Sequence, residues 1–158
     1  MRKLGSNRSP FRKATPEMWA YAYLYHSTWK FNLDSIMKRG LLPKDNGATN
    51  FNCKRGVYLT HDAYIGIEML ETTENPNIDD PDNEPKVLLA ISTDHIQGNK
   101  LFVDNCYHFD EDPDDNIICF RYDLVIPPQY IQVIADTSKM SCKEISELIG
   151  QHQSVLIE

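Results

Sequence analysis

The spacing of hydrophobic residues near the N-terminus predicts a strand followed at once by a short helix. Residues 21–25 are rich in aromatic side chains and run into the polar residues of 26–28, as expected for a buried strand that ends in polar groups. The apolar residues of 33–37 then recur at the i, i+3, i+4 spacing of one helix face. Asn32 is suited to cap this helix and Gly40 to end it. The junction gathers polar side chains at one strand end.

Short apolar runs between turn residues predict the other strands. They are residues 56–60, 86–92, 101–103, 117–122, 130–134 and 154–157. The run 86–92 is the most apolar and predicts a central strand, whereas 101–103 predicts an edge strand. Because these strands do not alternate regularly with helices, the expected fold class is α+β with a few short helices.

Capping residues mark three further helices. Thr15 and Pro16 are placed as the N-cap and the first residue of one. A second is expected over 60–71, where Thr60 is the cap. The capping box of residues 141–144 opens a third helix, which Gly150 is expected to end.

Composition indicates one domain with a basic N-terminal arm. The chain has 158 residues, of which 41% are hydrophobic, which is enough for one core but few for two. Residues 1–14 carry five basic side chains and no acid, and are expected to form a mobile arm ahead of a single domain over 15–158. The formal net charge of −7 argues against a protein that coats nucleic acid by bulk electrostatics.

Targeting, membrane and metal signals are missing from the sequence. The first residues lack the apolar segment of a signal peptide, and no apolar run approaches the about 20 residues that span a bilayer, so a cytoplasmic location without membrane contact is expected. The four cysteines lie far apart without CxxC spacing, which predicts free thiols and no metal site. The histidines expected on the solvated surface, with no assigned role, are His95, His108 and His152.

The candidate chemistry lies at the strand-to-helix junction. Taken alone, His26 on a strand end is more often a structural histidine than a catalytic one. Ser27, Thr28 and Asn32 place further donors and acceptors beside it, as the binding site of a polar ligand such as a nucleotide requires. Tyr58 fits either a sheet aromatic or a ring that stacks on a flat heterocycle.

Three blocks of the sequence resemble a known family. His26-Ser27-Thr28, with Asn32-Leu33 and then Gly40-Leu41, resembles the H-x-T-x-x-x-N-L…G-L opening of DarT-type ADP-ribosyltransferases, and is also similar to RNA 2′-phosphotransferases and PARP-like enzymes. Residues 56–60 resemble the G-[IV]-Y-[FL] strand of the PARP-like group. Residues 125–131 resemble the P-P-E-Y-I segment that follows the last catalytic strand. The blocks stand in the expected order.

The resemblance implies an ADP-ribosyltransferase-like split β-sheet and an enzyme that cleaves the bond between nicotinamide and ribose in NAD. The ADP-ribose would pass to a macromolecular acceptor. Among the catalytic residues, His26 would hydrogen-bond the nicotinamide ribose and Tyr58 would stack on the nicotinamide ring. The backbone around Ser27 would hold the carboxamide, and Thr28 and Asn32 would line the same cleft.

The resemblance also implies two charged groups. Arg55, preferred to Lys54, would meet the pyrophosphate, because a planar guanidinium suits that group. A carboxylate would stabilise the cationic transition state. The family glutamate falls at about Asn116, so the neighbouring Asp115 is the candidate catalytic carboxylate. The acidic loop offers two alternatives, Glu111 and Asp114.

Two other functions stay open at this point. One is a protein of this fold that binds a nucleotide or another protein without catalysis. The other is the RNA 2′-phosphotransferase reaction, which also consumes NAD and needs several basic residues in the cleft. The acceptor is undecided, because the net charge favours a protein whereas a set of basic residues would suit a nucleic acid. That set comprises residues 1–13, Lys38, Arg39, Lys44, Lys54 and Arg55.

Overall fold

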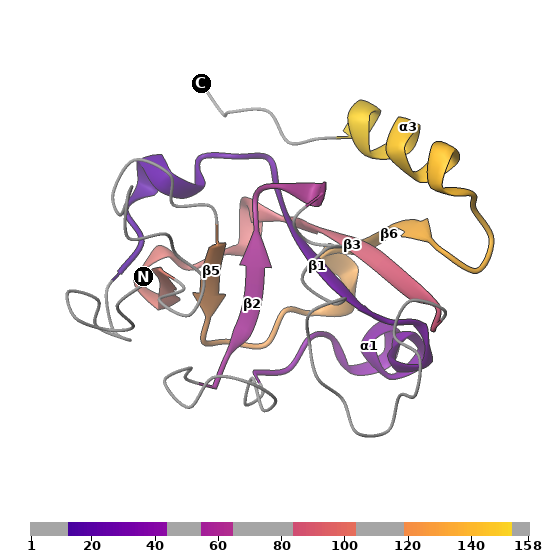
Figure 1. Ribbon diagram of the computed structural model, residues 1–158. Helices are drawn as coiled ribbons and strands as arrows, with labels where there is room; N and C mark the ends of the chain where they lie inside the picture. Colours follow the sequence, from indigo (N-terminus) through magenta and orange to yellow (C-terminus); the bar gives the residue numbers. More distant parts are fainter. Residues whose placement is uncertain (1–12, 44–54, 65–83, 104–118, 153–158) are drawn as a thin grey trace, which may run out of the picture.

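The computed structural model describes residues 13–43, 55–64, 84–103 and 119–152. These residues form one six-stranded antiparallel β-sheet with two α-helices, in the strand order β4-β5-β2-β1-β3-β6 (Figure 1). The strands are β1 (Tyr23–Trp29), β2 (Val57–Thr60), β3 (Lys86–Ser92), β4 (Leu101–Val103), β5 (Cys119–Tyr122) and β6 (Ile131–Asp136). The α-helices are α1 (Leu33–Arg39) and α3 (Cys142–His152). Short 3-10 turns are η1 (Pro16–Trp19), η2 (Lys30–Asn32), η3 (Thr93–His95), η4 (Gly98–Lys100) and η5 (Pro128–Tyr130). The predicted α+β class is confirmed.

Strand pairing divides the sheet into two halves. β1 pairs with β3 along its whole length, from Tyr23 opposite Ser92 to Trp29 opposite Lys86. In the other half, β2 pairs with β5 through all four of its residues. Between the halves, β1 and β2 are in register at one pair, Tyr25 with Thr60. The halves β4-β5-β2 and β1-β3-β6 therefore meet at this pair, and β1 continues past it on the β3 side.

Hydrophobic layers cover both faces of the sheet. On one face, Ile36 of α1 packs into the cluster that contains Leu89 of β3. On the other face, Ile145 and Ile149 of α3 pack against apolar residues of β3 and β6, and Figure 1 shows α3 beside β6. Since both faces are covered, residues 86–91 are all buried. The prediction of a central strand there is confirmed, and its continuous apolar run follows from the double burial.

The sheet edge includes two residues that were expected to belong to the arm. The N–H group of Ala14 donates to the carbonyl of Leu101 at 3.0 Å, and Lys13 forms a bridge with Phe102. Lys13 and Ala14 therefore belong with β4, the predicted edge strand. Residues 1–12 lie outside the described part of the chain, as do the predicted strand 154–157 and most of the helix expected over 60–71.

The predictions about helix caps hold in part. Asn32 occupies the N-cap position of α1 as predicted, but its side chain makes no capping hydrogen bond, and its amide donates to the hydroxyl of Thr28. The capping box at Ser141 is confirmed, since Ser141 and Glu144 bond each other's backbone N–H groups. However, α3 does not end at Gly150. It continues to His152, whose carbonyl accepts a hydrogen bond from the Tyr25 hydroxyl at 2.8 Å.

We expect alanine substitutions at Gly40 and Gly150 to have opposite effects on stability. Gly40 follows α1 with φ of +85°, and a Cβ there would overlap the carbonyl of Ile126. Gly40→Ala should therefore lower the free energy of unfolding by about 2 kcal/mol. Gly150 lies inside α3 with room for a Cβ, so Gly150→Ala should raise it by roughly 0.5–1 kcal/mol. Urea unfolding of both variants measures this, and a stabilised Gly40→Ala protein would contradict it.

Candidate functional site

The candidate site lies where β1 separates from β2. His26 is the fourth residue of β1 (Tyr23–Trp29), so the prediction that it stands at a strand end is wrong. The polar residues Ser27 and Thr28 remain in the strand because their pairing with β3 continues to Trp29. This position is one residue beyond the Tyr25–Thr60 pair that joins the two halves. β3 therefore pairs with the backbone of His26, Ser27 and Thr28 on one side, whereas on the other side no register pair with β2 follows Tyr25–Thr60.

His26 bridges the separation by a hydrogen bond to the backbone of Tyr58. Its Nδ1 lies 2.7 Å from the Tyr58 carbonyl oxygen. Because a carbonyl oxygen only accepts, Nδ1 must carry the proton. In the neutral ring Nε2 is then the acceptor, so the contact selects one tautomer and one orientation of the imidazole. Both residues are partly exposed, which suits a site that meets a ligand.

Only the main chain of Tyr58 bonds His26 in the contact described above. The side chain of Tyr58 points to the same face of the sheet as that of Arg121, its partner on β5, because paired residues of adjacent strands share one face. Stacking of the Tyr58 ring on a ligand stays a prediction.

Thr28 and Asn32 form the second contact of the site. The Asn32 amide donates to the Thr28 hydroxyl oxygen at 3.1 Å, which joins the last part of β1 to the start of α1. Thr28 is buried, and Asn32 and Ser27 are partly exposed. Four of the predicted residues therefore lie close together, on β1 and at the end of η2: His26, Ser27, Thr28 and Asn32. Their closeness follows from their short separation along the sequence.

Arg55 is exposed just before β2. Its Nε donates to the carbonyl of Pro43 at 2.8 Å, which ties the start of β2 to the segment after α1. Antiparallel pairing puts this end of β2 near the end of β1 that leads into α1. The remaining predicted residues, Lys54, Glu111, Asp114, Asp115 and Asn116, lie outside the described residues. The catalytic carboxylate therefore stays a prediction.

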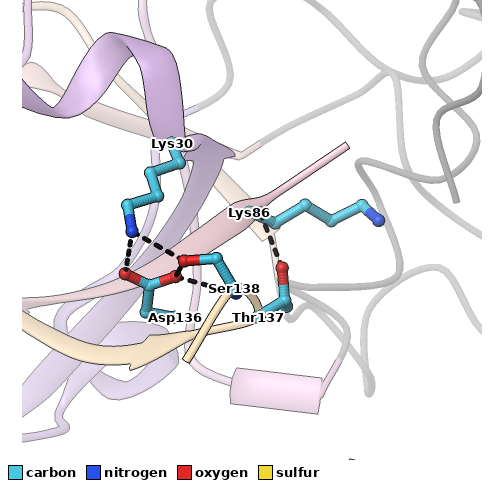
Figure 2. A network of polar contacts seen from close by, with 5 residues as sticks. All are labelled: Lys30, Lys86, Asp136, Thr137 and Ser138. Carbon is cyan, nitrogen blue, oxygen red and sulfur yellow. Dashed lines mark hydrogen bonds and ion pairs between the residues drawn. The ribbon is translucent and has the colours of Figure 1, made fainter. Parts of the chain in front are cut away.

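A polar network missed by sequence reasoning supports the same end of β1. Lys30, the first residue of η2, has its Nζ 2.9 Å from a carboxylate oxygen of Asp136 and 2.6 Å from the Ser138 hydroxyl (Figure 2). The Ser138 hydroxyl in turn donates to Asp136 at 2.7 Å. Burial by itself would raise the pKa of Asp136, but the hydrogen bonds from Ser138 and Lys30 hold the pKa below its ordinary value. The network fastens η2 to the end of β6.

Two histidines that were expected on the solvated surface pack against aromatic rings instead. His95 stacks on Tyr130, with ring centroids 4.2 Å apart and planes within 6°. Both ring nitrogens of His95 are buried, and within the described part of the chain neither makes a hydrogen bond of good geometry. Desolvation lowers the pKa of His95, although a weak contact with the Ser92 backbone and the Asp94 carboxylate act in the opposite direction. His152 packs edge-on against Tyr25, and His108 lies outside the described residues.

The buried ring of His95 should make stability depend on pH. Because its pKa is lower in the folded chain than the value of 6.5 that the unfolded chain has, the unfolded state binds more protons once the pH falls below that value. We therefore expect the free energy of unfolding to fall between about pH 8 and about pH 5.5. His95→Gln, which cannot titrate, should lose less stability over this range. Urea unfolding at both pH values measures the difference, and equal losses would contradict the assignment.

Among the described residues, Asp136 also has a shifted pKa, but it titrates outside this pH range. The pKa of Asp136 is lowered from a value of 3.8, so the stability that Asp136 contributes is lost only at more acidic pH.

Comparisons with known proteins give no match, and the described residues contain no metal site or membrane-spanning helix. A scan against models of known protein families matches none, and a search of curated proteins finds no significant match. Among the described residues, no group of three or more metal-ligating side chains could hold a metal ion. In the same residues, no helix has the length and apolar character needed to cross a membrane. The two described cysteines, Cys119 and Cys142, are free thiols.

Proposed function

We propose that this protein is an NAD-dependent mono-ADP-ribosyltransferase with an ADP-ribosyltransferase-like split sheet. The observation that carries the proposal is the separation of β1 from β2 after the Tyr25–Thr60 pair, with the imidazole of His26 held in that separation by the Tyr58 carbonyl. The resemblance implies a split sheet, and the single register pair between β1 and β2 supports that part of the proposal. In the proposal, the ligand lies between the two halves and His26 meets it there.

The tautomer of His26 supports its assigned role. With the proton on Nδ1, a neutral ring presents Nε2 as an acceptor for a ribose hydroxyl. The hydrogen bond to Tyr58 keeps the ring oriented before a ligand arrives, which lowers the entropic cost of binding. Thr28 and Asn32, bonded to each other, supply a second polar wall from β1 and the start of α1.

Two charged groups, the Arg55 guanidinium and a carboxylate, complete the proposed site. Arg55 is exposed near the same end of β1 and β2, where its guanidinium can pair with a pyrophosphate. NAD is the substrate, and its nicotinamide leaves as the bond to ribose breaks and positive charge develops on the sugar. A carboxylate from Asp115 or its neighbours would stabilise that charge by several kcal/mol. Asp115→Ala and Asn116→Ala, compared for NAD turnover, identify which position supplies the group.

Titration of the purified protein with NAD in a calorimeter tests the proposal first. We expect saturable binding that weakens in His26→Ala, followed by release of nicotinamide in a longer incubation. No binding by the folded protein would overturn the proposal. Binding without release would favour the reading in which the site holds a nucleotide without catalysis. Turnover of NAD only in the presence of 2′-phosphorylated RNA would indicate the phosphotransferase reaction.

A further inference from the structure

A surface next to α1 combines exposed aliphatic side chains with basic residues. Leu41 and Ile126 pair through two backbone hydrogen bonds of 2.9 Å, and their own side chains are buried. In an antiparallel pair the next residues face each other on the opposite side. Leu42 and Val125 are thus adjacent on the outer surface, where they are 37% and 45% exposed.

Met37 is a further exposed apolar residue, on α1. It was predicted to share the buried face of the helix with Ile36, but it is 41% exposed, because the buried face of α1 is centred on Ile36. Met37 lies one helical turn before Gly40, where an added Cβ would meet the backbone of Ile126 and Pro127. Single exposed apolar residues are common on protein surfaces, whereas a group of them beside charged residues is typical of an interface.

The basic residues stand in the last turn of α1. Lys38 and Arg39 are both exposed there, and the acid of this helix, Asp34, lies in the first turn at the other end. Arg55 adds a third positive charge beside Pro43. This local excess of positive charge stands out in a chain whose formal net charge is −7. We call Met37, Lys38, Arg39, Leu42 and Val125 together the α1 patch.

We propose that the α1 patch docks an acidic, amphipathic segment of a partner protein. Carboxylates of that segment pair with Lys38 and Arg39, while its apolar side chains cover Leu42, Val125 and Met37. The negative charge of the rest of the molecule repels acidic segments, so attraction is confined to the patch and gives the contact its specificity. This inference does not depend on the proposed NAD chemistry.

The composition of the patch favours a protein partner over two alternatives. A nucleic acid would use the basic residues but would leave the aliphatic centre uncovered, because single strands gain their further binding energy by stacking on aromatic rings. A second copy docked symmetrically through the same patch would oppose Lys38 and Arg39 of one copy to those of the other, so like charges would repel at the contact. An acidic segment with apolar side chains satisfies both the charged and the aliphatic part of the surface.

Fluorescence polarisation with a defined probe tests the docking. The probe is a labelled peptide of about twenty residues in which glutamates and leucines recur at helical spacing. Two control peptides replace the leucines by serine or the glutamates by lysine, and a labelled single-stranded oligonucleotide of equal charge serves as the nucleic-acid probe. We expect the acidic amphipathic peptide to bind most tightly and both control peptides to bind at least about tenfold more weakly.

Two double variants test whether the peptide binds at the α1 patch. Leu42→Ser with Val125→Ser, and Lys38→Glu with Arg39→Glu, should each weaken the peptide by about tenfold or more. Matched controls elsewhere on the chain are Val133→Ser, at a residue that is 37% exposed on β6, and Lys143→Glu on α3, and both should bind as the parent does. All substituted residues are exposed, so the variants should stay folded, which circular dichroism checks.

Several results would overturn the proposal. They are the absence of peptide binding, binding that the two patch variants leave unchanged, and tighter binding of the oligonucleotide that Lys38→Glu with Arg39→Glu abolishes. Concentration-dependent dimers in sedimentation that the patch variants dissociate would instead assign the surface to a second copy of the chain.

Discussion

His26→Ala is expected to reduce nicotinamide release from NAD by at least about a hundredfold while leaving the chain folded. The substitution removes the hydrogen bond to the Tyr58 carbonyl and with it the imidazole that the proposal assigns to the nicotinamide ribose. Loss of one partly exposed hydrogen bond should cost only about 1 kcal/mol of stability. Nicotinamide release is measured by chromatography, NAD affinity by calorimetry, and folding by the circular dichroism melting midpoint.

Two further variants serve as controls for His26→Ala. One tests the two ring nitrogens of His26 separately, and the other removes a histidine outside the candidate site. His26→Asn keeps a side-chain donor near the Tyr58 carbonyl but lacks an acceptor at the place of Nε2, so it should recover stability without recovering activity. His61, one residue beyond β2 and stacked on Tyr21, provides the matched control, because His61→Ala lies past the joined end of the two halves. Release by His26→Ala at the parent rate would contradict the assigned role.

Asp123→Ala is expected to produce the largest loss of stability among the polar substitutions. Arg121 is only 1% exposed, and its guanidinium bonds Asp123 through Nε at 2.7 Å and Nη2 at 3.2 Å while lying 4.5 Å from the Phe102 ring centroid. Removing the carboxylate leaves a buried cation without this partner, which should lower the free energy of unfolding by about 3 kcal/mol. Urea unfolding measures the loss.

A second substitution and a second ion pair serve as controls for Asp123→Ala. Adding Arg121→Met, which keeps an apolar stem over Phe102, should restore much of the lost stability because no buried charge then remains. Lys30→Met removes Lys30 from the pair of Figure 2, but the buried Asp136 keeps two donors, the N–H group and the hydroxyl of Ser138, so this variant should lose only about 1 kcal/mol. Equal losses in Asp123→Ala and Lys30→Met would show that the remaining donors to Asp136 do not compensate for the lost cation.

Parts of the fold and of the site that depend on local spacing could be predicted from the sequence. The apolar run 86–92 predicted a central strand, and the structure buries it between two hydrophobic layers. Gly40 was predicted to end α1, and it does so with a positive φ. His26, Ser27, Thr28 and Asn32 were predicted to cluster, which short separation along one strand and turn ensures.

Contacts between distant residues could not be predicted in this way. The partner of His26 is a backbone carbonyl 32 residues away, and every residue has such a carbonyl, so composition carries no signal for it. Lys30 and Ser138 are 108 residues apart and meet only because β3 and β6 pair beside β1. His95 has polar neighbours in the sequence, yet the ring of Tyr130 covers it in space.

By itself the sequence therefore determined the approximate places of the described strands and of α1 and α3, and the closeness of His26 to Asn32, because periodic spacing and turn residues act over a few positions. Tertiary structure alone decided that β1 and β2 are in register at only one residue pair, that His26 bonds the Tyr58 carbonyl, and that Met37, Leu42 and Val125 are exposed. These features depend on which strands pair and where their register stops. Strand pairing is set by the burial of the whole core and not by any one segment.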